Sequence, residues 1–372
     1  MKTRVVKVRS NRQVAAAGRR AARALKAGKL VGFATETVYG VAAVASNRAA
    51  MNRLRKIKSR PLRPFSVHLP RPEDVRRYVC DVPIGAGRLI EKAWPGPVTL
   101  VLPAGAEHAG DLLRHRRLNS VLCYDGAIGL RCPDEAVAGA MLSAVKASVV
   151  ACSANPANEP SPRSAKEVLA SLDGSIDLLI DSGPTRFGAD STIVRFAEDG
   201  SWKVVRRGVY DTQAIRRFLK RTILFICTGN TCRSAMAAGL AKKLLADRLD
   251  CRVSDLKAKG LDVLSAGVFA SDGARAAPEA VCAARELGAD ISRHRSRKLT
   301  IELIYEADLV FCMTDVHVYE VRSLMPEVAD KAKRLDADCN VPDPIGGGTA
   351  VYRRAARQIE RALRICLDKE KP

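Results

Sequence analysis

The segment that most constrains the fold of this chain begins at Ile223. The apolar run 223–226 leads directly into a seven-residue loop that starts at Cys227 and ends at Arg233, and apolar positions at helical spacing follow. A strand, a tight loop and a helix in this order gather backbone N–H groups and the positive end of a helix dipole around one point. The segment therefore predicts an anion-binding loop between a buried strand and a helix.

Short apolar strands alternate regularly with helices through the rest of the chain. The pattern predicts strands at 222–226, near Val263 and at 308–313, and helices at 234–249, 278–287 and 349–367. Such alternation is typical of an α/β domain with a small parallel sheet. We expect this domain to cover residues 221–372.

Cys227 stands at the base of the loop, where inward N–H groups and the helix dipole favour a thiolate over a thiol. It is therefore the candidate nucleophile. Arg233 offers a planar fork for two phosphoryl oxygens, and Gly229 permits a backbone turn that is closed to most residues. Asn230 and Ser234 can brace the loop and the thiolate by hydrogen bonds. The remaining loop residues are Thr228, Thr231 and Cys232.

Cleavage of a phosphoryl group also needs an acid for the leaving group. Asp343 is the candidate, because the prolines on both sides of it and the glycines at 346–348 predict a loop that can hold a carboxylate over a neighbouring site.

Residues 1–210 show a different and less regular order of elements. Helical spacing at 12–28 leads into a strand at 30–34, and Asn47 and Ser164 are expected to begin helices. Further strands are expected at 65–69, 98–102, 149–152, 177–180, 191–195 and 202–206. This half predicts an α+β domain with a large twisted mixed sheet. Residues 211–220 are expected to link the two domains, in part as a helix.

The N-terminal half carries neither a P-loop nor a Rossmann glycine motif, so any nucleotide must be held in another way. Polar and cationic residues follow several predicted strands and helices. They include Thr35, Lys58 with Arg60, and Ser153 with Asn155.

The net charge is concentrated in this half. Residues 1–220 hold 37 Lys+Arg and 19 Asp+Glu, a balance of +18, and residues 221–372 contribute 25 and 21, or +4, of the total of +22. Such an excess favours polyanionic partners, nucleotide or RNA, although a solvated basic surface explains it equally well.

Eleven scattered cysteines without a Cys-x-x-Cys pair indicate neither a disulfide framework nor a zinc site. We expect no membrane span, because every apolar run is far shorter than a bilayer requires. The basic N-terminus lacks the apolar core of a signal peptide, so we expect a cytoplasmic protein.

The C-terminal domain resembles the low-molecular-weight protein tyrosine phosphatases over roughly 221–368, in the loop at Cys227 and in the Asp-Pro pair at Asp343. The resemblance implies that Cys227 forms a phosphocysteine and that Arg233 binds the phosphoryl group. It also implies that Asp343 protonates the leaving group and then activates water. Cys232 would form a reversible disulfide with Cys227, and no metal or other cofactor would be needed.

Substrate choice depends on two positions where this sequence departs from the phosphotyrosine pattern. Thr231 stands where a bulkier aliphatic residue is usual, and Ile345 with Gly346 stands where aromatic residues are usual. Both features are similar to bacterial protein arginine phosphatases, although those usually have Phe at the place of Ile345. We expect dephosphorylation of protein phosphoarginine, with phosphotyrosine as the alternative.

The N-terminal half resembles the L-threonylcarbamoyladenylate synthases over about 10–210. The match includes segments at 33–40, 57–61, 94–100, 129–133, 152–156, 190–194 and 205–208. The family joins L-threonine, bicarbonate and ATP, and its product serves the tRNA threonylcarbamoyl-transfer machinery. The resemblance implies that ATP contacts Lys58, Arg60, Ser153, Asn155, Ser161 and Arg207. Threonine would contact Thr35, His68, Arg131 and Ser191, and Mg²⁺ would accompany the nucleotide.

A second hypothesis for this half is an RNA-binding module fused to a regulatory phosphatase. His68 has a second interpretation too, as a core histidine. The stretch 105–126 looks expanded relative to the family and leaves the lid of the site in question.

Overall fold

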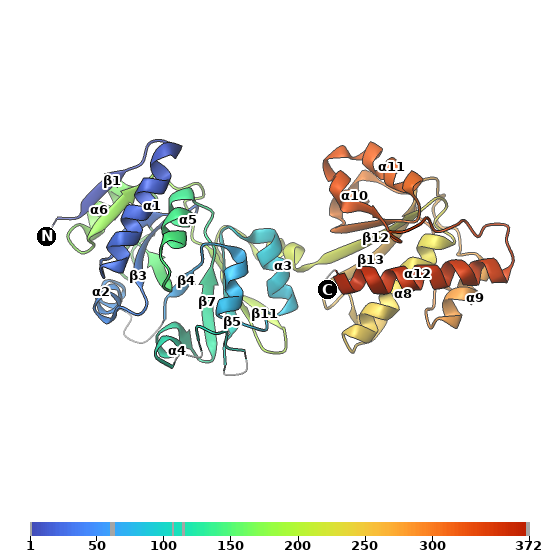
Figure 1. Ribbon diagram of the computed structural model, residues 1–372, viewed down its shortest axis with the longest axis horizontal. Coiled ribbons are helices and arrows are strands. Elements are labelled where there is room, and N and C mark those ends of the chain that lie inside the picture. Colours follow the sequence, from blue (N-terminus) through green and yellow to red (C-terminus); the bar gives the residue numbers. More distant parts are fainter. Residues whose placement is uncertain (1, 60–63, 106–107, 114–115, 370–372) are drawn as a thin grey trace. The chain divides into compact units, whose positions relative to one another are not determined.

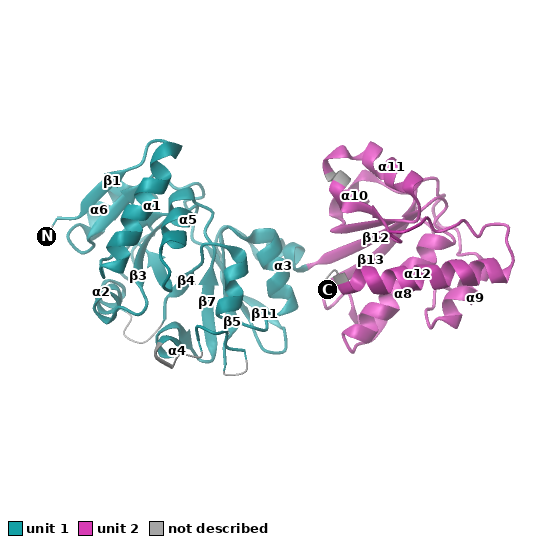
Figure 2. Cartoon of the chain, viewed as in Figure 1, with its two compact units in different colours: residues 1–219 teal, residues 220–372 magenta. Residues whose placement is uncertain are grey.

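The computed structural model describes residues 2–59, 64–105, 108–113 and 116–369. The chain divides into two compact units, Met1–Leu219 (unit 1) and Lys220–Pro372 (unit 2), which Figure 2 shows in two colours. Within the described ranges, no helix is both long and apolar enough to cross a membrane.

Unit 1 is built on one mixed sheet, in the strand order β1-β9-β2-β3-β8-β4-β7-β5-β10-β11, with β6 added beside β7. The pairs β1-β9, β2-β9, β4-β7 and β5-β10 are parallel, and the remaining pairs are antiparallel. In chain order the strands are β1 (Arg4–Lys7), β2 (Val31–Ala34), β3 (Tyr39–Val44), β4 (Ser66–His68), β5 (Val98–Pro103), β6 (Cys123–Tyr124), β7 (Ala127–Arg131), β8 (Val149–Ser153), β9 (Leu178–Asp181), β10 (Thr192–Phe196) and β11 (Trp202–Arg206).

The helices of unit 1 cover both faces of this sheet. Alternate residues of β3 belong to different cores: Val41 and Ala43 pack into one core, and Ala42 and Val44 into the other. A strand buried on both faces is apolar throughout. The helices are α1 (Asn11–Lys26), α2 (Arg48–Lys58), α3 (Ile84–Ala93), α4 (Arg116–Leu122), α5 (Ala136–Ala144), α6 (Ala165–Leu172) and α7 (Thr212–Leu219).

Helices α1 and α5 lie side by side over one face (Figure 1). They approach closely because Gly18 has no side chain: a Cβ atom there would lie 2.6 Å from Cβ of Ala140. Two predicted helix starts are confirmed as N-caps: Asn47 accepts a bond from the amide of Ala50, and Ser164 from the amide of Glu167.

Residues 211–220, predicted as a linker, mostly belong to unit 1. Helix α7 buries Ile215 and Leu219 in the core of that unit, and the Leu219 carbonyl accepts a hydrogen bond from Nη1 of Arg88 at 2.7 Å. The helix itself was expected. It is not a free linker, because its amphipathic face packs against α3. Part of the stretch 105–126 lies outside the described residues, and the described part includes α4 and β6.

Unit 2 has a four-stranded parallel sheet in the order β13-β12-β14-β15. Its strands are β12 (Arg221–Cys227), β13 (Leu261–Gly267), β14 (Leu309–Cys312) and β15 (Ala332–Arg334). Its helices are α8 (Arg233–Arg248), α9 (Pro278–Glu286), α10 (Ile301–Glu306), α11 (Asp315–Leu324) and α12 (Thr349–Lys369).

Helices α8, α9 and α12 pack on one face of this small sheet, and α10 and α11 on the other (Figure 1). Phe225 and Phe311 stack with ring centroids 5.7 Å apart beneath the first group. Both predicted fold classes, the large mixed sheet and the small parallel sheet, are confirmed. Helices α10 and α11 and strand β15 were not predicted, because they are short and carry few apolar positions in a regular period.

Gly208 provides a test of how the end of β11 is packed. A Cβ atom at this position would lie 2.2 Å from the carbonyl oxygen of Asp190, which is backbone and cannot move aside cheaply. We expect Gly208→Ala to lower the free energy of unfolding of unit 1 by about 2 kcal/mol. Gly87→Ala in α3 is the control, because nothing lies within 4 Å and alanine favours helix. Urea denaturation of both variants measures the difference, and equal stabilities would contradict the packing.

Candidate functional sites

The loop of unit 2 folds around the sulfur of Cys227, the last residue of β12. The amide of Asn230 donates a hydrogen bond to Sγ at 3.2 Å, and Oγ of Ser234 lies 2.9 Å from the same sulfur. Asn230 adopts a left-handed φ of 54°, which turns its amide inward. The sequence predicted that Gly229 would take the unusual conformation, but its φ is not in the left-handed region. A Cβ at Gly229 would meet only Oγ1 of Thr231, at 3.7 Å.

Asn230 is held from three directions. Its Nδ2 donates to Oγ of Ser234 at 2.8 Å, its Oδ1 accepts from the amide of Arg297 at 2.9 Å, and its carbonyl lies 2.7 Å from Nε2 of His294. Gly267 lets β13 approach the loop, since a Cβ there would lie 2.5 Å from the Thr228 carbonyl. Sequence reasoning missed His294 and Arg297, because their role depends on a contact across 60 and more residues.

Two opposing effects act on the Cys227 thiol. Burial raises its pKa, and the hydrogen bonds from Ser234 and Asn230 and the charge of Arg233 oppose that rise. Burial prevails in the unliganded site and raises the pKa of Cys227 above that of an ordinary thiol, so the thiolate predicted from the loop is not favoured there. Arg233, whose charge opposes this rise, also has a carboxylate beside it.

Asp343 is that carboxylate. Its Oδ2 accepts a hydrogen bond from Nη2 of Arg233 at 2.5 Å, and Nη1 of the same guanidinium donates to the Val341 carbonyl at 3.2 Å. Among the described residues, the buried Nε of Arg233 finds no partner. The structure thus brings together the three residues proposed for catalysis, Cys227, Arg233 and Asp343.

The other loop side chains face neighbouring elements. Oγ1 of Thr228 lies 3.0 Å from Nε2 of His317, whose pKa is lowered to about 4 by burial and by Arg233. Sγ of Cys232 lies 3.4 Å from the Tyr352 hydroxyl and 3.6 Å from Oγ1 of Thr231. Cys232 is a buried residue of the loop. Its disulfide with Cys227 stays a prediction.

Unit 1 holds a cavity of about 480 Å³ lined mainly by polar side chains. Lys58, the last residue of α2, reaches into it and donates to Oγ of Ser153 at 3.2 Å and to Oδ1 of Asn155 at 2.8 Å. Lys58 is distant in the sequence from the neighbouring residues Ser153 and Asn155, and the structure brings them together in one cavity. Arg60 lies outside the described residues.

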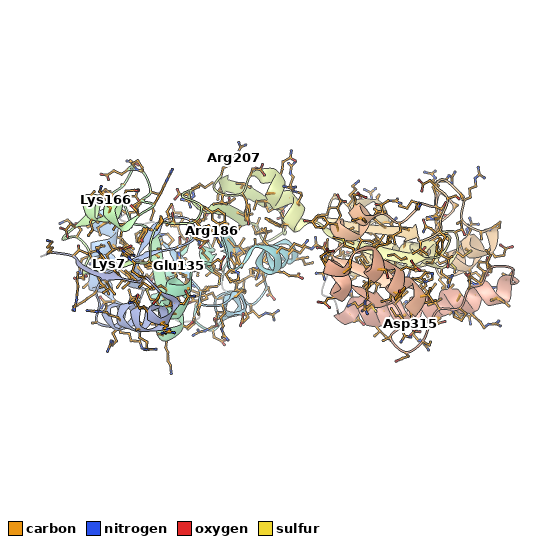
Figure 3. The ribbon with its side chains drawn as sticks, turned by 90° about the horizontal axis from the view of Figure 1, so that it is seen from above. Lys7, Glu135, Lys166, Arg186, Arg207 and Asp315 are labelled. Atoms are coloured by element: carbon orange, nitrogen blue, oxygen red, sulfur yellow. The ribbon has the colours of Figure 1, made fainter. Side chains whose placement is uncertain are left out.

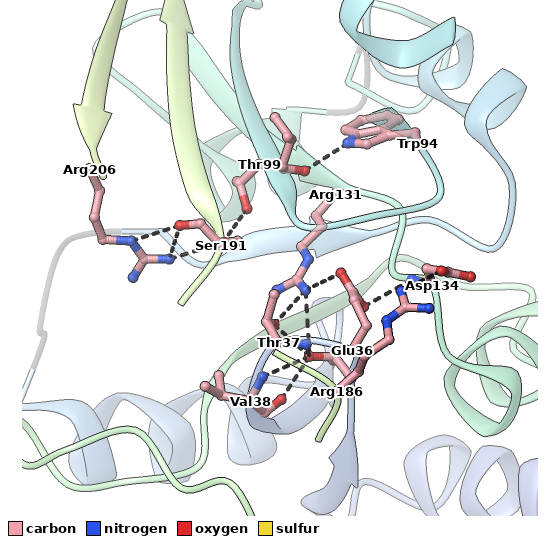
Figure 4. Close-up of polar contacts among 12 residues, drawn as sticks. Glu36, Thr37, Val38, Trp94, Thr99, Arg131, Asp134, Arg186, Ser191 and Arg206 are labelled. Atoms are coloured by element: carbon pink, nitrogen blue, oxygen red, sulfur yellow. Dashed lines mark hydrogen bonds and ion pairs between the residues drawn. The ribbon is translucent and has the colours of Figure 1, made fainter. Parts of the chain in front are cut away.

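A buried arginine forms another wall of this cavity (Figure 4). Nη2 of Arg131 donates to Oε1 of Glu36 at 2.8 Å, to Oγ1 of Thr37 at 2.6 Å and to Oγ1 of Thr35 at 3.4 Å. Its Nε has no partner among the described residues. Glu36 was not predicted, although it stands between two residues of the same motif and supplies the only ionised partner of Arg131 that the described residues show.

His68 lines the cavity with a defined tautomer. Its Nδ1 lies 3.2 Å from the Ser66 carbonyl and must carry the proton of that bond, which leaves Nε2 as an acceptor. Burial, together with the nearby charge of Arg131, lowers the pKa of His68 to about 3. His68 is thus a neutral cavity residue rather than a core residue.

Ser191 is positioned by Arg206 and Thr99 (Figure 4). Nη2 of Arg206 donates to Oγ of Ser191 at 2.9 Å, and Nη1 lies 3.3 Å from Oδ2 of Asp190. Oδ1 of Asp190 accepts a bond from Ser161 at 2.9 Å.

Arg207, predicted to face ATP, is exposed and points outward (Figure 3). Arg206 lines the cavity instead, because consecutive residues of an extended chain face opposite sides. Because the two arginines are adjacent, the sequence alone could not show which of them faces the cavity.

No group of three or more His, Cys, Asp or Glu side chains suited to a metal ion occurs in the part of the chain that the structure describes. Asp190 in the cavity is already engaged by Ser161 and Arg206.

These two sites define a class for each unit. A thiol at the foot of an anion-binding loop, with an arginine and an acid, is the arrangement of a cysteine-dependent phosphatase. A polar cavity with fixed cations, in the fold of unit 1, is suited to an anionic substrate such as a nucleotide.

Comparisons with known proteins agree with this division. Residues 23–208 match the Sua5, YciO and YrdC family, described as telomere recombination, and residues 222–370 match the low molecular weight phosphotyrosine protein phosphatases. The chain belongs to the first family through unit 1 and to the second through unit 2.

Individual relatives match one unit each. The threonylcarbamoyl-AMP synthase of Pyrococcus abyssi is 34% identical over 175 residues, which cover 47% of this chain and 49% of that protein. The chain therefore spans about half the length of that synthase. The protein-arginine-phosphatase of Geobacillus stearothermophilus is 38% identical over 146 residues, covering 38% of this chain and 90% of that protein.

A solved structure of a doubly substituted Pyrococcus abyssi Sua5 shares the fold. It has a TM-score of 0.51 at 24% identity and covers 72% of this chain and 91% of that one.

Ser234 offers a direct test of the thiolate environment. Its hydroxyl accepts from Asn230, and its own proton can go to the Cys227 sulfur at 2.9 Å or to the more distant Ala266 carbonyl at 3.4 Å. We expect Ser234→Ala to raise the pKa of Cys227 by about one unit and to slow alkylation at neutral pH about tenfold. Mass spectrometry of the peptide that contains Cys227 measures the rate of alkylation by iodoacetamide. Ser254→Ala, in the exposed 3-10 helix Val253–Asp255, is the control, and an unchanged rate in Ser234→Ala would contradict this role.

Proposed function

We propose that unit 1 makes L-threonylcarbamoyladenylate from L-threonine, bicarbonate and ATP, and that unit 2 removes phosphoryl groups from phosphoarginine in proteins. The observation that carries the first half is the cavity with Lys58, Arg131 and Arg206 on its walls. The observation that carries the second is the loop around Cys227, in which the charge of Arg233 acts on the thiol and Arg233 in turn pairs with Asp343.

In unit 1 the carbamate oxygen of threonine attacks the α-phosphorus of ATP, and the bond to the pyrophosphate oxygen breaks. Lys58 and Arg206 are placed to stabilise the charge that builds on the phosphoryl oxygens and on the departing pyrophosphate. The proposed step uses no covalent nucleophile from the protein, so the rate depends on how the reactants are oriented.

The contacts of each substrate follow from the walls of the cavity. We assign ATP to Lys58, Ser153, Asn155, Ser161 and Arg206. We assign threonine to the opposite wall, where Nε2 of His68 can accept a hydrogen bond; the residues of this wall are Thr35, His68, Arg131 and Ser191. Magnesium would enter on the phosphates of the nucleotide, since Mg²⁺ commonly retains water and phosphate ligands.

The product would pass to the machinery that transfers the threonylcarbamoyl group to tRNA. If unit 1 instead bound RNA without synthesis, no adenylate would form from the three substrates. Mass spectrometry of the threonylcarbamoyl-AMP made by the purified chain therefore tests the proposal directly, and its absence would overturn it.

Arg206 and Arg207 form a matched pair for this assay. We expect Arg206→Gln to reduce the turnover of adenylate synthesis at least about tenfold, because a charge-assisted contact to phosphate or to Ser191 is lost. Arg207→Gln removes the same charge from an exposed position and should leave the rate close to wild type. Thermal unfolding of both variants reports whether unit 1 is folded, because turnover by the separate unit 2 does not depend on it. A larger loss in Arg207→Gln would reverse the assignment.

In unit 2 the Cys227 thiolate attacks phosphorus and the P–N bond of phosphoarginine breaks. Asp343 gives its proton to the departing guanidine nitrogen, then takes a proton from the water that hydrolyses the phosphocysteine. The incoming phosphoryl group replaces Asp343 on Arg233, which frees the carboxyl group for the leaving atom. Peroxide would inactivate the thiol, and Cys232 would protect it as a disulfide.

Phosphoarginine is supported by Thr231 and by Ile345. Thr231 offers a hydroxyl at the loop, and Ile345 after the Asp-Pro pair is 72% exposed and provides no ring for stacking. Phosphotyrosine is the second candidate, because Phe269 is 75% exposed and its amide donates to the Thr228 carbonyl at 3.0 Å. An aromatic residue thus lies next to the loop, which sequence reasoning overlooked.

Thr231→Ile separates the two substrates. The change removes the hydroxyl and adds apolar surface, so it should favour a phenyl ring. We expect wild type to prefer phosphoarginine peptides at least about tenfold in kcat/KM, or about 1.4 kcal/mol, and Thr231→Ile to shift the preference toward phosphotyrosine. Steady-state kinetics on both peptides measures this. Equal or better turnover of phosphotyrosine by wild type would overturn the arginine assignment.

A further inference from the structure

A second cavity of about 420 Å³ lies in unit 2, apart from the nucleophile loop. Its walls come from α8, from β13 and from the segment 290–297. Small residues of α8, Ala235, Ala238 and Gly239, form its floor, and the lining side chains around them are mostly charged. None of its lining residues belongs to the catalytic set of Cys227, Arg233 and Asp343.

The charged lining is mainly cationic. Lys242, Arg293, Arg295, Arg297 and His294 line the cavity. Two carboxylates also line it, but both are engaged: Asp262 pairs with Lys220 at 3.0 Å, and Asp290 accepts from the amide of Ser292.

These cations lie close enough to repel one another. Burial and the charge of Arg297 both lower the pKa of Lys242, which is partly buried, although Asp262 acts in the opposite direction. Burial and the charges of Lys242, Arg297 and Arg295 lower the pKa of His294. In the described part of the chain, Lys242 forms no hydrogen bond or ion pair within normal distance. Like charges held together around a hollow favour binding of an anion.

The same segment also holds the nucleophile loop. His294 and Arg297 supply two of the bonds to Asn230, whose amide and side chain in turn contact Sγ of Cys227 and Oγ of Ser234. A ligand that relieves the repulsion within 293–297 would therefore also stabilise the conformation of Asn230.

We propose that this cavity binds a small, multiply charged phosphoanion of the pyrophosphate type, and that its occupancy holds the segment 293–297 against Asn230. Guanidinium groups match phosphoryl oxygens better than a point charge does, and the limited volume suits a small ion rather than a polymer. Pyrophosphate as the natural ion rests on the proposed reaction of unit 1, whereas the binding site itself does not.

The test follows ligand binding in the cavity through the imidazole NMR signal of His294. The chain has five histidines, and His294→Gln identifies the imidazole signal of His294 in NMR spectra. Measurements use the full chain with Arg233→Met, which disables phosphate binding in the nucleophile loop. We expect pyrophosphate to raise the pKa of His294 by about half to one unit. It should also slow hydrogen exchange in the peptide 228–232.

Two substitutions of α8 provide the control. In the same background, Lys242→Met should weaken the apparent Kd for pyrophosphate about tenfold. Lys243→Met should leave the Kd unchanged, because Lys243 pairs with Asp247 at 2.8 Å and does not line the cavity. No shift of His294, or equal affinity in all three chains, would overturn the site.

Orthophosphate binding as tightly as pyrophosphate would overturn the choice of ion. All of these readouts are independent of adenylate synthesis and of phosphatase turnover, so failure of this proposal is distinguishable from failure of the proposed function.

Discussion

Buried cations need a partner, and this requirement shapes both sites. An ionised group in a protein interior without compensation costs several kcal/mol. Arg131 meets the requirement with Glu36, and Arg233 meets it with Asp343. Each site thus stays charged for an anionic substrate while remaining stable without one. Where the internal carboxylate competes with the ligand and can move away, part of the binding free energy is used to separate the pair.

That competition has a different consequence in each unit. Glu36 is buried and is also held by the amide of Asp134, so it stays with Arg131 and fixes the guanidinium in place. The Asp343 side chain is 42% exposed and follows a proline, so it can leave Arg233 when a phosphoryl group arrives. In the proposed reaction, the Asp343 carboxylate that pairs with Arg233 in the unliganded site takes up a proton from solvent after it is displaced, and only then serves as the acid. One residue compensates the charge and later supplies the proton.

Structural features that are set by neighbouring residues along the chain could be predicted from the sequence. The strand, loop and helix around Cys227 are contiguous, and the strands of unit 1 follow from apolar runs. The sequence could not predict which of two adjacent arginines turns inward, since Arg206 and Arg207 differ only in the face of the chain they occupy. Nor could it predict that Asn230 rather than Gly229 takes the left-handed conformation, because that choice depends on His294 and Arg297. These contacts join segments far apart in the chain, and only the packed sheet sets them.

The two candidate sites would attract anions by different physical means. In unit 2 the loop precedes the N-terminus of α8, so backbone amides and the helix dipole contribute to binding. In unit 1 the helix that reaches the cavity, α2, does so with its C-terminal residue, Lys58, and that end of a helix carries the negative pole. Lys58 must therefore offset the dipole before it can attract phosphate, and side-chain cations supply most of the favourable field. Single substitutions of these side chains should accordingly affect unit 1 more than comparable changes affect the backbone-built loop of unit 2.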